Sequence, residues 1–349
     1  MLEVSIKKKV PGFSLDTEFS VNDGETLGLL GVSGCGKSMT IRCIAGILKP
    51  DKGRIVLNGR VLFDSEKRVN LPPRLRNVGY LFQSYALFPN MTVLQNVESG
   101  IRETGALRRE KAELWIERMR IAYRRDAYPR KLSGGERQRC ALARMFASEP
   151  ELLLFDEPLS ALDAHLRTTI ELELIDFLKE YPNPAVFVSH SRDEVAHICE
   201  NICVLENGHG HDSRPTRDVF RRPETVSAAL LSGMRSFSRL ERVSPAVIKA
   251  LNWGEVLLAV PETFPESADT VGIRSHFVKI SGGGSVNEID AQISRVIRDV
   301  SEVTLYLTTK GGGELTLKLP PARDGAREYE VGDAIKVSAA PEDLIPLNA

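Results

Sequence analysis

The sequence has no excess of charge of either sign, few cysteines, and no uninterrupted apolar stretch long enough to cross a membrane. Its 349 residues carry 46 lysines and arginines against 47 aspartates and glutamates, a formal net charge of −1. A chain this close to neutrality lacks the basic excess with which many proteins attract nucleic-acid phosphates, so we expect no nucleic-acid partner. The composition, 42% hydrophobic and 27% charged, is typical of a folded globular protein and excludes a wholly disordered one.

The longest stretch without a charged residue, 77–97, contains Pro89 and several amide side chains, so we predict that it does not span a membrane. The lysines near the N-terminus are not followed by an apolar segment, so no secretory signal is expected. Five scattered cysteines, an odd number, fit a reducing compartment better than a disulfide framework. Together these absences predict a cytoplasmic location.

The length of the chain favours two domains. Residues 1–228 alternate short apolar runs with longer helical stretches and predict an α/β domain, with a helical insertion at about residues 84–131. Residues 229–349 show short alternating runs between glycine-rich turns, which predict a small all-β, barrel-like domain. Within the α/β domain, four apolar runs are continuous enough to be buried parallel strands: 27–31, 78–82, 152–156 and 185–189.

A phosphate-binding loop is indicated directly after the first of these runs, where residues 31–38 fit the pattern G-x-x-x-x-G-K-[ST] and a helical stretch follows. Glycines at these positions let successive backbone N–H groups surround phosphate oxygens, and the helix N-terminus adds a favourable dipole. The lysine would reach the β- and γ-phosphates of ATP, and the serine would bind Mg²⁺. The predicted nucleotide-binding residues of this loop are Gly31, Val32, Ser33, Gly34, Cys35, Gly36, Lys37, Ser38 and Met39.

Two carboxylates follow the apolar run at 152–155. A carboxylate at the carboxyl end of a buried strand lies where open α/β sheets bind their ligands. Asp156 would therefore join the Mg²⁺ shell, and Glu157 would orient or deprotonate the attacking water. The alternative is a strand that simply ends in two solvated acids.

A second anion site is indicated at Ser133, Gly134 and Gly135, because these residues open a helix whose first N–H groups are free to bind an anion. A chain with one phosphate loop already holds its own nucleotide, so this site would serve the nucleotide of a partner. The alternative is an ordinary capped helix start.

These motifs, in this order and spacing, resemble the ATP-binding cassette (ABC) ATPases over about residues 1–228. The resemblance implies a P-loop NTPase cassette with ATP and Mg²⁺ as ligands. It gives Gln83 contacts with Mg²⁺ and the attacking water and a role in sensing a permease. It makes Asp163 a residue that communicates across a dimer and His190 a contact of the γ-phosphate. It also makes Glu157, His190, Gln83 and Lys37 the catalytic set, with Ser38, Gln83 and Asp156 at the metal.

In this family two cassettes pair head to tail, so the resemblance implies a homodimer in which each ATP lies between the phosphate loop of one chain and residues 133–135 of the other. Such an interface is two-fold. Phe13 stands where the family carries an aromatic residue that stacks on adenine. A phenylalanine there is about as well explained as part of the core.

The short helical insertion and the β-rich C-terminal part resemble the ATPase subunits of binding-protein-dependent importers. This implies a separate integral-membrane permease dimer, an extracytoplasmic solute-binding protein, and a peripheral position at the cytoplasmic face of the inner membrane. Residues 53–67 and 85–89 look most like the molybdate importer ATPases, so molybdate or tungstate is the expected solute. Sulfate, iron(III), polyamine and sugar importers share the layout and remain alternatives, as does a soluble ABC ATPase without a transport role.

The C-terminal domain resembles the TOBE module that follows such cassettes, best over residues 288–347. Two hypotheses remain open for it. It binds an oxyanion through groups such as Ser294, Thr308 or Thr309 and regulates transport, or it serves only as a dimerising or spacing domain.

Overall fold

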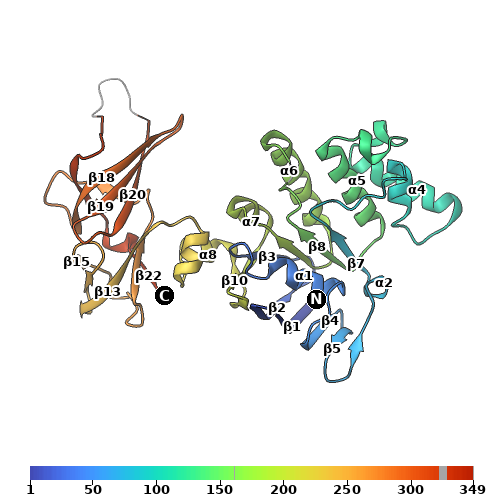
Figure 1. Cartoon of the computed structure of the whole chain (residues 1–349), viewed down its shortest axis with the longest axis horizontal. Helices are drawn as coiled ribbons and strands as arrows, with labels where there is room; N and C mark the ends of the chain where they lie inside the picture. Colours follow the sequence, from blue (N-terminus) through green and yellow to red (C-terminus); the bar gives the residue numbers. More distant parts are fainter. Residues whose placement is uncertain (161, 322–327, 349) are drawn as a thin grey trace. The chain divides into compact units, whose positions relative to one another are not determined.

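The computed structural model of the protein describes residues 1–160, 162–321 and 328–348, and its contacts divide the chain into two compact units, Met1–Thr216 and Arg217–Ala349 (Figure 1). The sequence analysis ended the first domain at residue 228, whereas the contacts divide the chain after Thr216. Most of α8 (Thr216–Arg221) therefore belongs to the second unit by its contacts. Within the described residues, no helix combines the length and the apolar character that a membrane span requires.

The first unit is built on one twelve-stranded sheet of order β6-β5-β4-β1-β2-β11-β10-β3-β9-β8-β7, with β12 paired to β10. One half is mainly antiparallel, and the half from β10 to β7 is parallel. The strands are β1 (Leu2–Val10), β2 (Phe13–Val21), β3 (Thr26–Leu30), β4 (Lys52–Leu57), β5 (Arg60–Asp64), β6 (Val69–Asn70), β7 (Val78–Leu81), β8 (Leu152–Asp156), β9 (Ala185–Val188), β10 (Asn201–Glu206), β11 (His209–Gly210) and β12 (Arg214–Pro215).

The register of the parallel half brings three strand ends to one level. Val188 of β9 pairs with Leu29 of β3 on one side and with Asp156 of β8 on the other. Because parallel strands all end at the same edge, the loops that follow β3, β8, β9 and β7 meet there. The four apolar runs predicted as strands are strands: β3, β8 and β9 are buried along their whole length, whereas β7, beside β8, alternates half-buried and buried residues.

Helix α1 (Lys37–Ala45) follows the loop after β3 and packs its apolar residues Ile41 and Ile44 into the core of the sheet. It ends at Gly46, whose φ of +80° places it in the left-handed region that favours glycine as a helix C-cap. The helix that the sequence expected after the phosphate loop is confirmed.

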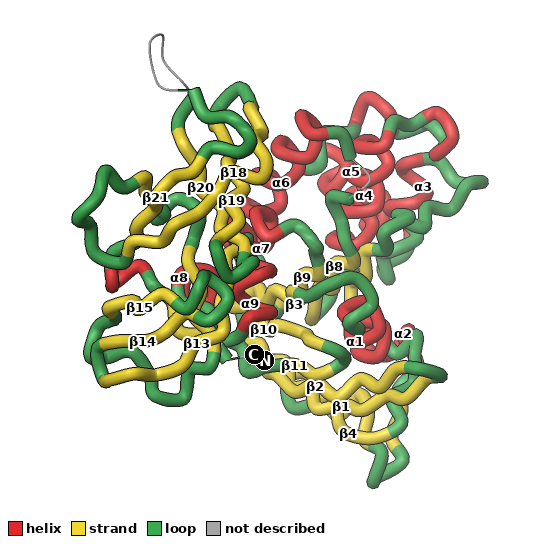
Figure 2. Tube along the Cα trace, turned by 60° about the vertical axis from the view of Figure 1, so that its left-hand side comes forward, coloured by secondary structure: helices red, strands yellow, loops and turns green. Residues whose placement is uncertain are grey.

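The helices between β7 and β8 form their own small core, and they lie together in Figure 2. Val97 of α3, Ile116 of α4 and Cys140 of α5 are all fully buried in it. These helices are α3 (Val93–Glu98), α4 (Gly105–Arg118) and α5 (Gly134–Ala147), with the 3-10 turns η1 (Ala122–Arg124) and η2 (Pro129–Lys131). The remaining helices of the unit are α2 (Pro73–Arg76), α6 (Ala164–Glu180) and α7 (Arg192–Ile198).

The second unit confirms the predicted all-β domain. Two five-stranded sheets, of order β15-β14-β13-β16-β22 and β17-β21-β18-β19-β20, share one core around the fully buried Trp253. The elements are α9 (Val226–Leu231), η3 (Pro341–Asp343), β13 (Ser236–Ser244), β14 (Val247–Ala250), β15 (Val256–Ala259), β16 (Thr270–Ile273), β17 (Lys279–Ile280), β18 (Glu288–Arg298), β19 (Val303–Thr309), β20 (Glu314–Leu319), β21 (Ala334–Ser338) and β22 (Ile345–Leu347).

Candidate functional site

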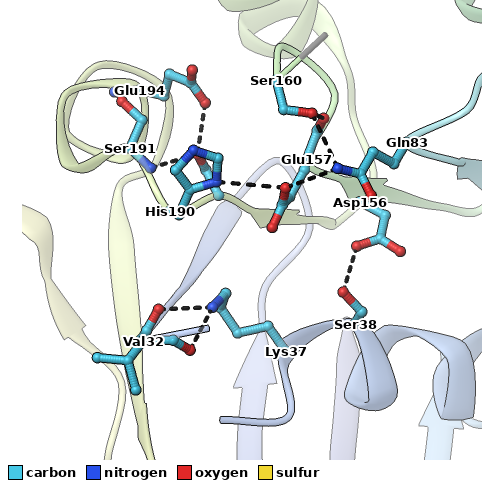
Figure 3. A network of polar contacts seen from close by, with 12 residues as sticks. Val32, Lys37, Ser38, Gln83, Asp156, Glu157, Ser160, His190, Ser191 and Glu194 are labelled. Carbon is cyan, nitrogen blue, oxygen red and sulfur yellow. Dashed lines mark hydrogen bonds and ion pairs between the residues drawn. The ribbon is translucent and has the colours of Figure 1, made fainter. Parts of the chain in front are cut away.

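The loop after β3 folds around the side chain of its own lysine. Lys37 is 6% exposed, and its Nζ donates hydrogen bonds to the carbonyl oxygens of Gly31 at 2.7 Å and Val32 at 3.1 Å (Figure 3). The Sγ atom of Cys35 lies 3.8 Å from the same ammonium group. Among the described residues this buried ammonium contacts neutral groups, and such an ammonium strongly attracts an anion.

Next to this loop, Ser38 and Asp156 are in direct contact. The Ser38 hydroxyl donates to Oδ1 of Asp156 at 2.7 Å, from the first turn of α1 to the last residue of β8 (Figure 3). The other carboxylate oxygen, Oδ2, accepts a hydrogen bond from the Tyr80 hydroxyl at 2.7 Å and lies 3.7 Å from the Arg42 guanidinium. The carboxylate is thus buried with donors on both oxygens.

The carboxylate of Glu157 is held between two other loops. Its Oε2 accepts a hydrogen bond from Nε2 of Gln83 at 3.2 Å, and Nδ1 of His190 lies 3.5 Å from the same oxygen (Figure 3). The backbone of Glu157 has a φ of +51°, which non-glycine residues rarely adopt, and its N–H donates to the carbonyl of Val188. Sequence-distant side chains therefore converge on this acid.

The buried carboxylate of Glu194 holds the loop that carries His190 in place. Ser189 donates its hydroxyl to Oε2 of Glu194 at 2.6 Å and accepts the N–H of Ser191 at 2.9 Å. Burial raises the pKa of the Glu194 carboxyl. The imidazole itself is exposed, so it remains free to meet a ligand from the solvent side.

Phe13, at the start of β2, packs against the phosphate loop. A Cβ atom built on Gly36 would lie 3.2 Å from Cζ of Phe13, and one built on Gly208 would lie 3.1 Å from it. The ring is half-buried against the core of the first unit. This position is beside the loop, and the adenine-stacking role stays a prediction.

The residues Ser133, Gly134 and Gly135 lie at the N-terminal end of a helix. They stand at the start of α5, which lies among α3, α4 and α6 and away from α1 in both Figure 1 and Figure 2. The Ser133 hydroxyl accepts the N–H of Glu136, and Glu136 accepts the N–H of Ser133. Asp163 similarly caps α6 by accepting the N–H of Leu166 at 3.0 Å. Ser133 and Asp163 thus each cap a helix within their own chain.

Tyr80 and Arg42 were missed by the sequence reasoning, although both face Asp156. Tyr80 lies in the predicted strand 78–82, and Arg42 lies one helical turn beyond Ser38. The available signal was that spacing of four residues on one helix face, since residues i and i+4 are neighbours on the surface of a helix.

In the second unit, Thr308 and Thr309 line a cavity of about 610 Å³ on the strands β18, β19 and β21, whereas Ser294 is not among its lining residues. The two lysines of the cavity are paired, because Lys310 lies 2.9 Å and Lys336 lies 3.8 Å from the carboxylate of Asp290. The Thr309 hydroxyl donates to backbone carbonyls. Of the hydroxyl groups predicted to bind an oxyanion, that of Thr309 is therefore already hydrogen-bonded within the chain.

Two family models match the sequence. One, described as ABC transporter, covers residues 15–160, and the other, described as TOBE domain, covers residues 271–347. The phosphate loop, Gln83, the 133–135 motif and the acidic pair all fall in the first match.

Similar proteins have names that point to import. The chain is 33% identical to the spermidine/putrescine import ATP-binding protein PotA 2 of Pseudomonas aeruginosa, over 93% of this chain and 91% of the relative. It is 36% identical to the molybdenum import ATP-binding protein ModC of Paramagnetospirillum magneticum, over 64% of this chain and 61% of the relative. Among solved structures, the dimeric post-hydrolysis state of the ATP-binding cassette MJ0796 bound to ADP and Pi matches with a TM-score of 0.54 and 26% identity, covering 62% of this chain and 99% of the other.

Proposed function

The chain belongs to the ATP-binding subunits of ABC transporters that carry a C-terminal TOBE domain, and from this premise we propose that it hydrolyses Mg²⁺-bound ATP to energise the import of a small solute through a separate permease. The observation that supports the hydrolytic part most strongly is the position of Glu157. Its carboxylate lies between Gln83 and His190 and follows directly on Asp156, which contacts Ser38 of the phosphate loop.

In this proposal the phosphate loop binds the ATP phosphates. The ammonium of Lys37 leaves the carbonyls of Gly31 and Val32 and binds the β- and γ-phosphate oxygens instead. These oxygens are charged and therefore accept stronger hydrogen bonds than the neutral carbonyls. Backbone N–H groups of residues 31–36 and the first turn of α1 supply further donors.

The donor set at Ser38, Asp156 and Gln83 fits Mg²⁺, because a hydroxyl, a carboxylate and an amide oxygen are all hard oxygen ligands, and two of the three are already in contact. Ser38 and Asp156 would hold the ion or its water molecules, and Gln83 would complete the set. When bound, the ion would neutralise charge on the phosphates.

Glu157 acts in the proposal as the group that orients a water molecule and accepts its proton. Gln83 and His190 position the carboxylate and, with a nucleotide present, His190 contacts the γ-phosphate. A general base of this kind contributes about a hundredfold to ten-thousandfold to a reaction rate.

Ser133, Gly134, Gly135 and Asp163 serve the nucleotide of a second copy of the chain. Helix α5 lies away from α1 within one chain (Figure 1), which supports this assignment, because in this proposal the loop before α1 already holds the chain's own nucleotide. The similar cassette MJ0796 was solved as a dimer. We propose the same head-to-tail pairing here, with Phe13 beside the adenine.

For the solute we propose a polyamine of the spermidine and putrescine class, which the sequence analysis held as an alternative. The support is that relatives matched along more than nine tenths of the chain, TOBE domain included, are named for spermidine and putrescine. Molybdate, the solute first expected, is the second candidate, because its named relative matches 64% of the chain. A solute-binding protein and a peripheral place at the cytoplasmic face of the membrane complete the proposal, and an oxyanion site in the C-terminal domain remains tied to the second candidate.

Two measurements test the proposal. The purified chain should hydrolyse ATP only with Mg²⁺, and absence of nucleotide binding would overturn the ATPase assignment. Cells lacking this chain should lose uptake of labelled spermidine or putrescine and regain it with the wild-type chain but not with Glu157→Gln. Retained polyamine uptake with lost molybdate uptake would favour the second candidate, and retention of both would contradict both solutes.

A further inference from the structure

Asp156 is the most deeply buried carboxylate of the site, at 4% exposure, and its two oxygens have different partners. Oδ1 accepts the hydroxyl of Ser38 at 2.7 Å, and Oδ2 accepts the hydroxyl of Tyr80 at 2.7 Å. A buried carboxylate needs donors on both oxygens to offset the loss of water. Ser38, however, is also a proposed metal ligand, so its hydroxyl oxygen would bind the metal ion besides contacting Asp156.

We propose that Tyr80 is a positioning residue for the metal site, in that its hydroxyl anchors Asp156 through Oδ2 and leaves Oδ1 directed toward Ser38 and the Mg²⁺ shell. This inference rests on the proposed ATPase function. Once Ser38 and Asp156 share an ion, the Tyr80 hydroxyl is the close donor that still fixes the orientation of the carboxylate.

The sheet supports this role through its register. Tyr80 of β7 pairs with Leu154 of β8, two residues before Asp156. Two residues along a strand are about 6.6 Å, which a tyrosine side chain spans and a short side chain does not. The ring is held in place by Phe82, at 4.3 Å between ring centroids, and by the core of the first unit.

The electrostatics also favour a phenol at this position. The phenol hydroxyl is an uncharged donor, and it donates to Oδ2 of Asp156 at 2.7 Å. A neutral donor holds the carboxylate without cancelling the negative charge that a cation requires. Arg42, the other group near Oδ2, is 3.7 Å away and half exposed, so solvent weakens its hold.

The test is the Mg²⁺ dependence of the Tyr80→Phe variant of the full chain, which keeps the ring and removes only the hydroxyl. The affinity of the ATP-loaded protein for Mn²⁺, measured by electron paramagnetic resonance, should fall about tenfold. This factor corresponds to the lower end of the free-energy range for a hydrogen bond to a charged group. ATP binding in EDTA should not change. In the ATPase assay, the KM for Mg²⁺ should rise while kcat recovers at saturating Mg²⁺.

Tyr85→Phe is the matched control, since the Tyr85 hydroxyl is buried in the following loop and has no hydrogen-bond partner among the described residues. It should leave Mn²⁺ affinity unchanged. Unaltered Mn²⁺ affinity in Tyr80→Phe, or a loss of kcat that saturating Mg²⁺ does not restore, overturns the inference. If the wild-type chain does not hydrolyse ATP even at saturating Mg²⁺, the proposed function itself fails, and this result is read from the wild type alone.

Should Tyr80→Phe lose the native circular dichroism, 3-fluorotyrosine at position 80 retains both ring and hydroxyl. Its ¹⁹F resonance should shift when Mg²⁺ is added to the ATP-loaded protein, whereas the same label at position 85 should not respond. An unresponsive label at position 80 would refute the positioning role.

Discussion

Nδ1 of His190 lies 3.5 Å from Oε2 of Glu157, although the two residues follow different strands. Gln83 reaches the same oxygen from the opposite side, at 3.2 Å, because β8 lies between β9 and β7 in the sheet. The acid after β8 is therefore flanked by the loops of both neighbouring strands. The chemistry proposed for Glu157 depends on this arrangement.

Glu157→Gln should bind ATP, accumulate as a closed dimer and lose turnover by at least about a hundredfold, because the amide cannot accept a proton from water. Size-exclusion chromatography with ATP and a phosphate-release assay would measure both effects. Glu151→Gln, at the opposite end of β8, should retain turnover, since Glu151 pairs with Arg60 outside the site. Turnover at the wild-type rate in Glu157→Gln would remove the assignment.

Gly36→Ala should weaken ATP binding by at least about tenfold, because alanine is strained at the Gly36 φ of +110° and its Cβ atom would also press on Cδ1 of Leu15, at 2.8 Å. Isothermal titration with ATP would measure the loss. Gly12→Ala is the control, since its φ of +78° is also left-handed but its Cβ atom meets nothing within 4 Å. Equal affinity in the two variants would contradict the argument.

Alkylation of Cys35 by N-ethylmaleimide should already be slow, because the side chain is 3% exposed, and should slow further when ATP is bound, because the phosphates would cover the loop that holds the thiol. Burial raises the pKa of the Cys43, Cys140 and Cys203 thiols to about 12, so these supply few thiolates for reaction near neutral pH. Mass spectrometry of the labelled chain would assign the site, with Cys35→Ser as the control. Equal labelling with and without nucleotide would refute the prediction.

The stability that Glu136 contributes at the start of α5 should decrease in acid. Burial favours a higher pKa for Glu136, but hydrogen bonds from the Ser133 N–H, Arg124 and Tyr123 outweigh it and lower the pKa from 4.5 to about 2. A lowered pKa stabilises the fold above pH 4.5, and this contribution is lost as the pH falls toward 2. The difference in urea-unfolding free energy between wild type and Glu136→Gln should therefore shrink over that window.

Glu117→Gln, an exposed glutamate of α4, is the control for this titration and should show no such narrowing. A stability difference for Glu136→Gln that stays constant from pH 6 to pH 3 would show that the hydrogen bonds around Glu136 do not act through its charge.

The loop at residues 31–38 and the buried strands could be predicted because their sequence signals are contiguous. Glycine spacing in residues 31–38 encodes a loop, and unbroken apolar residues at 152–155 encode a strand buried on both faces. The all-β fold of the second unit was predicted from alternation in the same way. The solute stays a proposal, since the relative named for molybdenum matches 64% of the chain, whereas a relative matched over 93% of it is named for spermidine and putrescine.

By itself the sequence determined the kinds of chemistry available to this protein: a phosphate loop, an acidic pair, and a helix start suited to an anion. Only the tertiary structure decided which side chains meet. Tyr80 and Asp156 are 76 positions apart, and it is the parallel register of β7 and β8 that joins them. The pairing of β8 with both β7 and β9 places Glu157 between Gln83 and His190, because hydrogen bonding between strands fixes distances that no local pattern of residues can encode.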